Sequence, residues 1–214
     1  MKMRILSLLA LCLTLAAVPA MAQTLYSNGA PNGTTDAWTI NFGFVVSDTL
    51  PAFAAGTTIT GAQFEMWLIE GDTLESAQLS ITSGENGGTS YFNQTVTFTQ
   101  DGCSLNQYTY DVCNESTSFS VAAPTSASWL NLQNAVTADG EPVYWDENSG
   151  PSSASESEVG TIPSEAFTVL GTTSSTTTST STSTTGTSVP EPSSIMLFGS
   201  GILGLAGMLR RKLF

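Results

Sequence analysis

The most regular feature of the chain is the alternation of apolar and polar residues between its two ends. The clearest run predicts a nine-residue strand from Trp38 to Val46, with an apolar residue at every second position. The same alternation predicts strands over residues 62–68 and 77–81. The glycine-rich turn at 84–88 leads from the second of these into a hairpin partner over residues 92–98.

Shorter strands are predicted after the hairpin, at residues 107–112, 117–121, 128–132, 142–145 and 166–170. Between these runs turn residues recur regularly, and no long stretch of this region has the apolar periodicity of a helix. The pattern therefore predicts an all-β domain over residues 23–170. We expect an antiparallel β-sandwich of the jelly-roll-like kind.

The first 22 residues have the pattern of a signal peptide. Two basic residues precede an apolar run over residues 5–18, and the motif Ala20-Met21-Ala22 has the small-x-small form of a signal peptidase site. A helix over this 14-residue run is too short to cross a hydrocarbon core of about 30 Å. We therefore expect signal peptidase to remove residues 1–22 and to leave Gln23 as the new N-terminus.

Residues 171–188 consist only of Gly, Thr and Ser, so they have no apolar side chain to bury. This composition predicts a disordered linker that acts as a stalk. Beyond it, the apolar run over residues 195–209 predicts a short transmembrane helix of about 22 Å, less than the thickness of the hydrocarbon core. The basic residues that follow are expected to stay in the cytoplasm, and they are Arg210, Arg211 and Lys212.

Residues 189–214 resemble a PEP-CTERM sorting signal, because a Pro-Glu-Pro motif, an apolar segment and a basic cluster follow one another in order. The motif residues are Val189, Pro190, Glu191 and Pro192. The resemblance implies that a Gram-negative bacterium exports the precursor and that an exosortase-type membrane transpeptidase cuts near the motif. It also implies transient insertion in the inner membrane and delivery to the cell surface or to exopolysaccharide. A permanent single-span anchor is the alternative.

All five basic residues of the chain lie in these terminal segments. Residues 23–189 carry 17 carboxylates and no Lys, Arg or His, which excludes side-chain salt bridges and repels nucleic acid. The missing His and Lys also exclude Ser-His-Asp and Ser-Lys catalysis and phosphate-binding loops. We therefore expect no enzyme activity and no cofactor, and glycoside hydrolysis by paired carboxylates is the one catalytic class left open.

Two cysteines remain once the signal peptide is removed, and they are Cys103 and Cys113. Because the exported domain enters an oxidising compartment, we predict a disulfide between them.

Acidic residues in two turn-like stretches offer oxygen ligands for a structural calcium ion. They are Asp139, Glu141, Asp146 and Glu147.

Two of the four tryptophans, Trp67 and Trp145, are candidates for a platform that stacks on sugar rings. Trp38 and Trp129 are assigned to the core. The favoured function is a structural or interaction protein of the cell surface or biofilm matrix, with extracellular polysaccharide as a candidate partner. A carbohydrate-binding or ice-binding module is the alternative, although Thr-x-Thr ladders suited to ice are missing from the domain.

Overall fold

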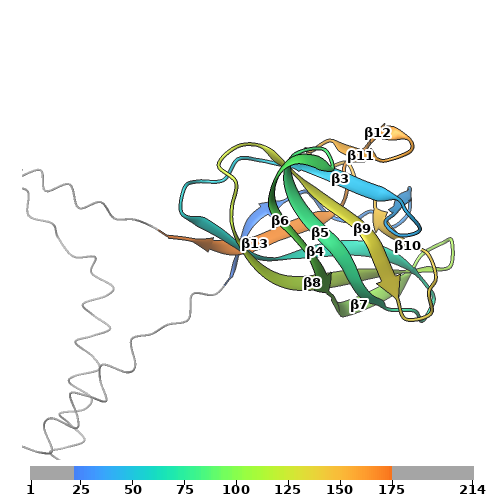
Figure 1. The fold of residues 1–214 in the computed structure, drawn as a ribbon. Helices are drawn as coiled ribbons and strands as arrows, with labels where there is room; N and C mark the ends of the chain where they lie inside the picture. Colours follow the sequence, from blue (N-terminus) through green and yellow to red (C-terminus); the bar gives the residue numbers. More distant parts are fainter. Residues whose placement is uncertain (1–21, 175–214) are drawn as a thin grey trace, which may run out of the picture. The chain divides into compact units, whose positions relative to one another are not determined.

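A computed structural model describes residues 22–174, which form thirteen strands in two antiparallel sheets packed face to face (Figure 1). The seven-stranded sheet contains β1 (Gln23–Ser27), β2 (Ala37–Thr39), β4 (Thr57–Ile69), β7 (Thr99–Leu105), β8 (Tyr110–Ala122), β10 (Val143–Asp146) and β13 (Phe167–Thr173). The six-stranded sheet contains β3 (Val45–Leu50), β5 (Leu74–Gly84), β6 (Gly87–Thr97), β9 (Ser128–Thr137), β11 (Ala154–Glu156) and β12 (Gly160–Ile162). The predicted β-sandwich is therefore confirmed.

Strand β4 is the centre of the seven-stranded sheet. One edge of β4 pairs with β8 along most of its length, and β8 in turn pairs with β7. The other edge pairs with β13 over Thr57–Phe64 and then with β10 over Met66–Leu68. Because β10 and β13 share this edge, the chain leaving β10 meets the chain entering β13, and Glu147 pairs with Glu165 there.

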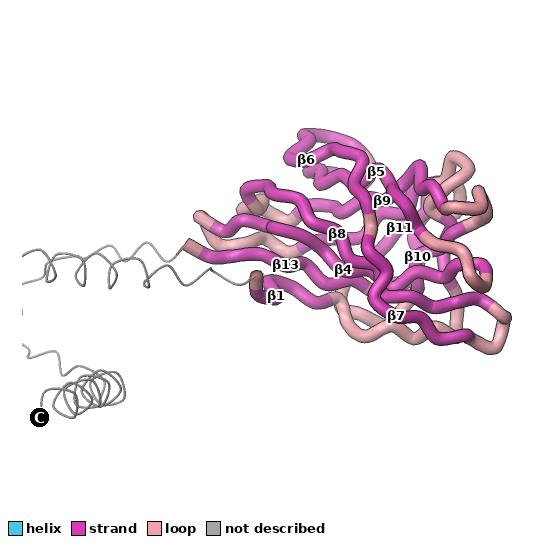
Figure 2. Tube along the Cα trace, turned by 90° about the horizontal axis from the view of Figure 1, so that it is seen from below, coloured by secondary structure: helices cyan, strands magenta, loops and turns pink. Residues whose placement is uncertain are grey.

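The core lies between the two layers, which Figure 2 shows from below with β4 and β13 side by side in one of them. Alternation along β4 directs Ala62, Phe64, Met66 and Leu68 into the core, as predicted. Trp145 of β10 packs edge-on against Phe64, with ring centroids 5.3 Å apart. Burial of such large apolar side chains is the main source of stability for a sandwich of this kind.

The strand predicted from Trp38 to Val46 is wrong. β2 ends at Thr39, the backbone turns with positive φ at Phe42 (55°) and Gly43 (96°), and β3 begins at Val45 in the other sheet. Phe42 lies at the turn and is 66% exposed. The alternation thus continues through a segment that passes from one sheet to the other.

Other strand predictions differ from the structure mainly at their ends. The two short strands expected at 107–112 and 117–121 are one strand, β8. The last strand reaches Thr173, so the domain extends beyond the predicted end at residue 170. Gly171 makes this extension of β13 possible, because a Cβ atom there would lie 2.1 Å from the carbonyl oxygen of Thr58 on β4.

The predicted disulfide between Cys103 and Cys113 is confirmed, and it joins β7 to β8. Gln23, the expected N-terminus after processing, is the first residue of β1. Residues 22–174 contain no helix with the length and apolar character needed to cross a membrane. The signal peptide, all but the first residues of the expected stalk, the transmembrane segment at 195–209 and the sorting motif lie outside the described residues.

Candidate functional site

The loop at residues 28–36, between β1 and β2, crosses the outer face of the seven-stranded sheet. The carboxylate of Asp146, at the end of β10, accepts hydrogen bonds from the backbone N–H groups of Asn32 and Gly33, both at 2.9 Å. It also accepts a hydrogen bond from Trp67 Nε1 at 2.6 Å. A buried carboxylate that accepts three such donors fixes the loop on the sheet.

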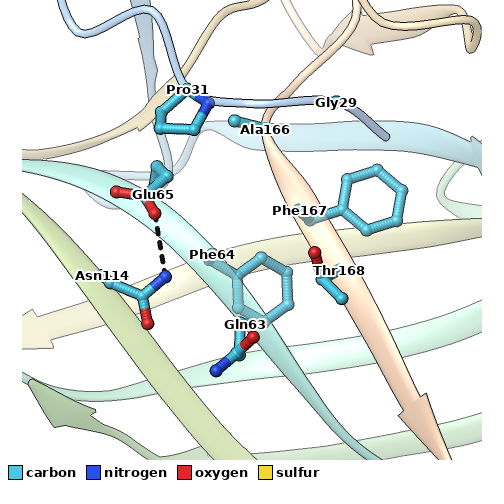
Figure 3. Close-up of a pocket in the computed structure, with 9 residues that line it drawn as sticks. All are labelled: Gly29, Pro31, Gln63, Phe64, Glu65, Asn114, Ala166, Phe167 and Thr168. Carbon is cyan, nitrogen blue, oxygen red and sulfur yellow. Dashed lines mark hydrogen bonds between the residues drawn. The ribbon is translucent and has the colours of Figure 1, made fainter. Parts of the chain in front are cut away.

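Beside the loop, a cavity of about 50 Å³ lies over β4 and β13 (Figure 3). Glu65 and Asn114 form one side of it, and Asn114 Nδ2 donates to Glu65 Oε1 at 2.8 Å. Pro31 of the loop lies above Glu65 in this view. A second hollow, of about 230 Å³, lies between the same loop and the β7–β8 hairpin, and Pro31 and Glu65 line it as well.

The two acidic side chains below the loop have raised pKa values. Burial raises the pKa of Glu65, the Asn114 hydrogen bond opposes this, and the negative charge of Asp146 adds to it. Burial also raises the pKa of Asp146, although its N–H donors oppose the increase. Both carboxyl groups are thus held in a hydrogen-bonded layer beneath the loop, where burial disfavours their charged forms.

Aromatic side chains gather at the far end of this face. A hollow of about 190 Å³ is lined by Asp36, Ala37, Trp67, Tyr110 and Tyr144. Tyr108 stacks on Trp67 with a centroid distance of 5.9 Å and an interplanar angle of 25°, and it is 50% exposed. Tyr110 meets Tyr144 edge-on at 5.6 Å.

We call Trp67, Tyr108, Tyr110 and Tyr144 the aromatic cluster. β4, β8 and β10 position three of its members because Trp67 pairs with Val112 on one side and with Tyr144 on the other. Burial raises the pKa of Tyr144 to about 12, and the neighbouring Tyr110 adds to the increase. The Tyr144 phenol therefore stays a neutral hydrogen-bonding group at physiological pH.

The tryptophan platform predicted from sequence is wrong. Trp145 is 0% exposed and donates its Nε1–H to the carbonyl of Ala166, and Trp67 is 5% exposed beneath Tyr108. Trp38 packs against the core while remaining partly exposed, and Trp129 is also partly exposed. Tyrosines take the place expected of tryptophan at this surface, because Tyr144 faces outward where Trp145 faces inward.

The predicted calcium set does not come together. Asp139 and Glu141 lie in the turn before β10, whereas Asp146 and Glu147 lie at its far end, about 13 Å along an extended strand. Asp146 binds the loop, and Glu147 accepts a hydrogen bond from Trp38 Nε1 at 3.0 Å. Within residues 22–174, no three or more His, Cys, Asp or Glu side chains form a group suited to a metal ion.

Comparison with known protein families adds information on the C-terminal segment. Residues 188–212 match the model of the PEP-CTERM protein-sorting motif. The chain carries a PEP-CTERM sorting signal. The match confirms the resemblance and covers Val189–Pro192 together with the basic residues Arg210, Arg211 and Lys212.

The PEP-CTERM signal indicates an extracellular or cell-surface protein that is exported, sorted at a membrane and processed by an exosortase. No curated protein matches the chain. The PEP-CTERM signal therefore assigns the export and sorting of the protein.

Proposed function

We propose that this protein is a non-catalytic polysaccharide-binding component of the cell surface or exopolysaccharide matrix of a Gram-negative bacterium. In this proposal signal peptidase releases the N-terminus, and an exosortase in the inner membrane processes the PEP-CTERM signal. The β-sandwich then meets its ligand outside the cell, at the end of a Ser/Thr-rich stalk.

The observation that carries the proposal is the aromatic cluster beside a hollow on the outer face of the sheet. Sugar rings present flat C–H faces that pack on aromatic rings, and their hydroxyl groups bond to phenol and carboxylate oxygens. Tyr108 offers an exposed ring, Tyr110 and Tyr144 offer hydroxyl groups, and Asp36 offers a carboxylate. The negative charge of the domain favours neutral sugars over anionic ones.

The absence of catalysis is part of the same proposal. Hydrolysis of a glycosidic bond needs two carboxyl groups that are both open to the sugar. Glu65 and Asp146 are close enough to influence each other electrostatically and lie on the proposed binding face. Asp146, however, is fully buried and accepts three hydrogen bonds beneath the loop, which supports a structural role for it.

The binding test uses the full chain, purified in detergent, on affinity gels and in calorimetry with neutral and acidic bacterial polysaccharides. We expect the Tyr108→Ala and Tyr144→Ala variants to bind about tenfold more weakly, equivalent to about 1.4 kcal/mol for a lost stacking contact. Tyr91→Ala is the matched control, because Tyr91 is an exposed tyrosine on β6 of the other sheet. Wild-type protein that binds none of these polysaccharides, or cluster variants that bind like Tyr91→Ala, would refute the proposal.

The processing test is intact mass spectrometry of protein recovered from the cell surface and the medium. We expect an N-terminus at Gln23 and a C-terminus near the Pro190-Glu191-Pro192 motif. Full-length protein in the cytosol, with both ends intact, would contradict the proposed route, whatever the outcome of the binding test.

A further inference from the structure

Seven carboxylates are buried in residues 22–174, a part of the chain that has no Lys, Arg or His. They are Asp48, Asp72, Glu115, Asp146, Glu147, Glu156 and Glu165. Removing a carboxylate from water is costly unless hydrogen bonds, a counterion or a proton compensate its charge. Because no basic side chain is available here as a counterion, each of these seven groups needs hydrogen bonds, a bound ion or a proton to compensate its charge.

Hydrogen-bond donors serve most of the seven. Asp146 accepts three, and Glu156 accepts three from the segment that follows it. Glu115 and Glu165 differ, because each is 0% exposed and neither residue has a hydrogen-bond partner for its carboxylate oxygens. Asp48 is equally buried, and its Oδ1 atom also has no partner.

Burial raises the pKa of Glu165, and the negative charge of Asp48 adds to the increase, so these two carboxyl groups lie near each other. The backbone N–H of Glu165 donates to Asp48 Oδ2 at 2.7 Å. Asn28 joins them, because its Nδ2 donates to Asp48 Oδ2 at 3.1 Å and to the carbonyl of Glu165 at 2.7 Å. Asp48 comes from β3 of one sheet and Glu165 from the segment entering β13 of the other.

We propose that Asp48 and Glu165 together bind a calcium ion at the junction of the two sheets. An ion that displaces the protons of both side chains gains three carboxylate oxygens without other partners and a charge of −2. Calcium accepts six to eight oxygen ligands and takes carbonyl, hydroxyl and water oxygens to complete the set. Ser152 Oγ, a hydrogen-bond partner of Asn28 that also lies against Asp48, is a hydroxyl candidate.

The chemistry of the site selects calcium among the common divalent ions. Zinc prefers nitrogen and sulfur ligands, and neither histidine nor a free thiol occurs in the described residues. Magnesium demands a small octahedral set and retains most of its water, which suits a buried site poorly. Calcium affinity falls with the number of charged ligands, so a site with two carboxylates fits the range of extracellular modules, whose dissociation constants are about 10⁻⁴ to 10⁻³ M.

The proposed ion makes the full stability of the domain depend on export. It links β3 to the start of β13, the last described strand before the PEP-CTERM signal. A weak calcium site stays empty where free calcium is scarce and fills outside the cell, so it stabilises the sandwich only there. This site is separate from the aromatic cluster, and its test is independent of polysaccharide binding.

The test follows thermal unfolding of the full chain in detergent, with a chelator, with calcium and with magnesium. Calcium at about 100 times its dissociation constant should raise the Tm of wild-type protein by roughly 5–10 °C, and magnesium should raise it less. Glu165→Gln and Asp48→Asn should lose this shift. Asp139→Asn is the matched control, because it removes one charge from an exposed turn and should keep the shift.

Terbium luminescence provides a second measurement that does not depend on the variants folding well. Tyr26 donates its hydroxyl to Asn28 Oδ1 at 2.7 Å, so its ring lies close enough to sensitise a terbium ion at the site. We expect wild-type protein to show terbium emission that calcium displaces. A Tm equal in calcium and in chelator, no displaceable emission, or a calcium shift retained by both Glu165→Gln and Asp48→Asn would overturn the proposal.

Discussion

Glu115 of β8 has no hydrogen bond to either carboxylate oxygen, although the residue is fully buried. Pairing with Phe64 across the β4–β8 ladder directs it to the core side of the sheet. Burial raises its pKa to about 7, the nearby Gln100 amide opposes this, and the negative charges of Asp101 and Glu65 add to the increase. Glu115 therefore carries a proton in the folded domain under mildly acidic conditions.

This raised pKa predicts that the folded domain loses stability as the pH rises. The folded state holds the Glu115 proton up to about pH 7, whereas the unfolded chain releases it near pH 4.5. The contribution is therefore complete below about pH 4.5 and is lost as the pH passes 7, on the order of 2–3 kcal/mol. In urea unfolding, Glu115→Gln should remove this part of the pH dependence and be more stable than wild type at pH 8.

Glu75→Gln is the control for this experiment, since Glu75 is exposed on β5. It should keep the wild-type pH profile. Other buried acids contribute to both profiles and cancel in the difference between variant and wild type. A Glu115→Gln profile parallel to that of wild type from pH 4.5 to 8 would show that Glu115 is ionised in the fold.

At the residue scale, alternation identified which positions share a face but not which face is buried. On β10, Tyr144 and Trp145 point to opposite faces of the sheet. Residue type alone led to the prediction that Trp145 is the exposed one, because a sugar platform needs an exposed tryptophan. The pairing of Trp145 with Met66 decides the matter, because Met66 belongs to the core. Tyr108 and Tyr110 are two residues apart in the sequence. They would have been recognised as part of this surface if the position of Trp67 beside them had been known.

The β7–β8 hairpin is the element that depends most on a covalent bond. Side chains of β7 are exposed along nearly its whole length, so the strand gains little from apolar burial. Its main attachments are the ladder to β8 and the disulfide between Cys103 and Cys113. Closing a loop of 11 residues stabilises a domain by about 2.8 kcal/mol in the chain-entropy model.

Removing this disulfide should therefore lower stability by about 2–3 kcal/mol and loosen β7 in particular. Cys103→Ser is the variant of choice, because Cys103 is exposed and Cys113 stays in the core. Thermal unfolding with and without dithiothreitol measures the loss, and hydrogen exchange locates it. The reductant should lower the Tm of wild type and leave Cys103→Ser unchanged; equal exchange of β7 in both proteins would contradict the assigned role.

At the element scale, strand predictions were correct where the turn between two strands has a recognisable cluster of turn residues, and wrong where it does not. The β5–β6 hairpin was predictable because its turn at Glu85 and Asn86 lies among glycines, and Asn86 and Gly88 have positive φ. The turn at Phe42 and Gly43 has no such cluster, so the change of sheet went undetected. The proposed calcium site joins β3 to the segment that enters β13. These segments are far apart in the chain, and a single sequence does not reveal that they meet.

The whole domain carries like charges with no ion pairs to offset them. Residues 23–189 hold 17 carboxylates and no basic side chain, so charge-charge interactions among ionised side chains of the domain are all repulsive. This excess was predictable in full from composition, because it needs no knowledge of the fold. It keeps the exported domain soluble and favours neutral ligands, and it lowers the stability of the compact state.

Salt should consequently stabilise this domain, whereas it weakens proteins that rely on surface ion pairs. Raising NaCl from about 10 to 150 mM shortens the Debye length from about 30 Å to 8 Å and screens the repulsion. With calcium held in excess, we expect the Tm to rise by about 2–4 °C for each kcal/mol gained. A control variant with fewer exposed charges should rise less, and its substitutions are Glu70→Gln, Glu75→Gln, Glu141→Gln and Glu158→Gln. A Tm that falls with salt would show that attraction, not repulsion, dominates the electrostatics and would contradict this prediction.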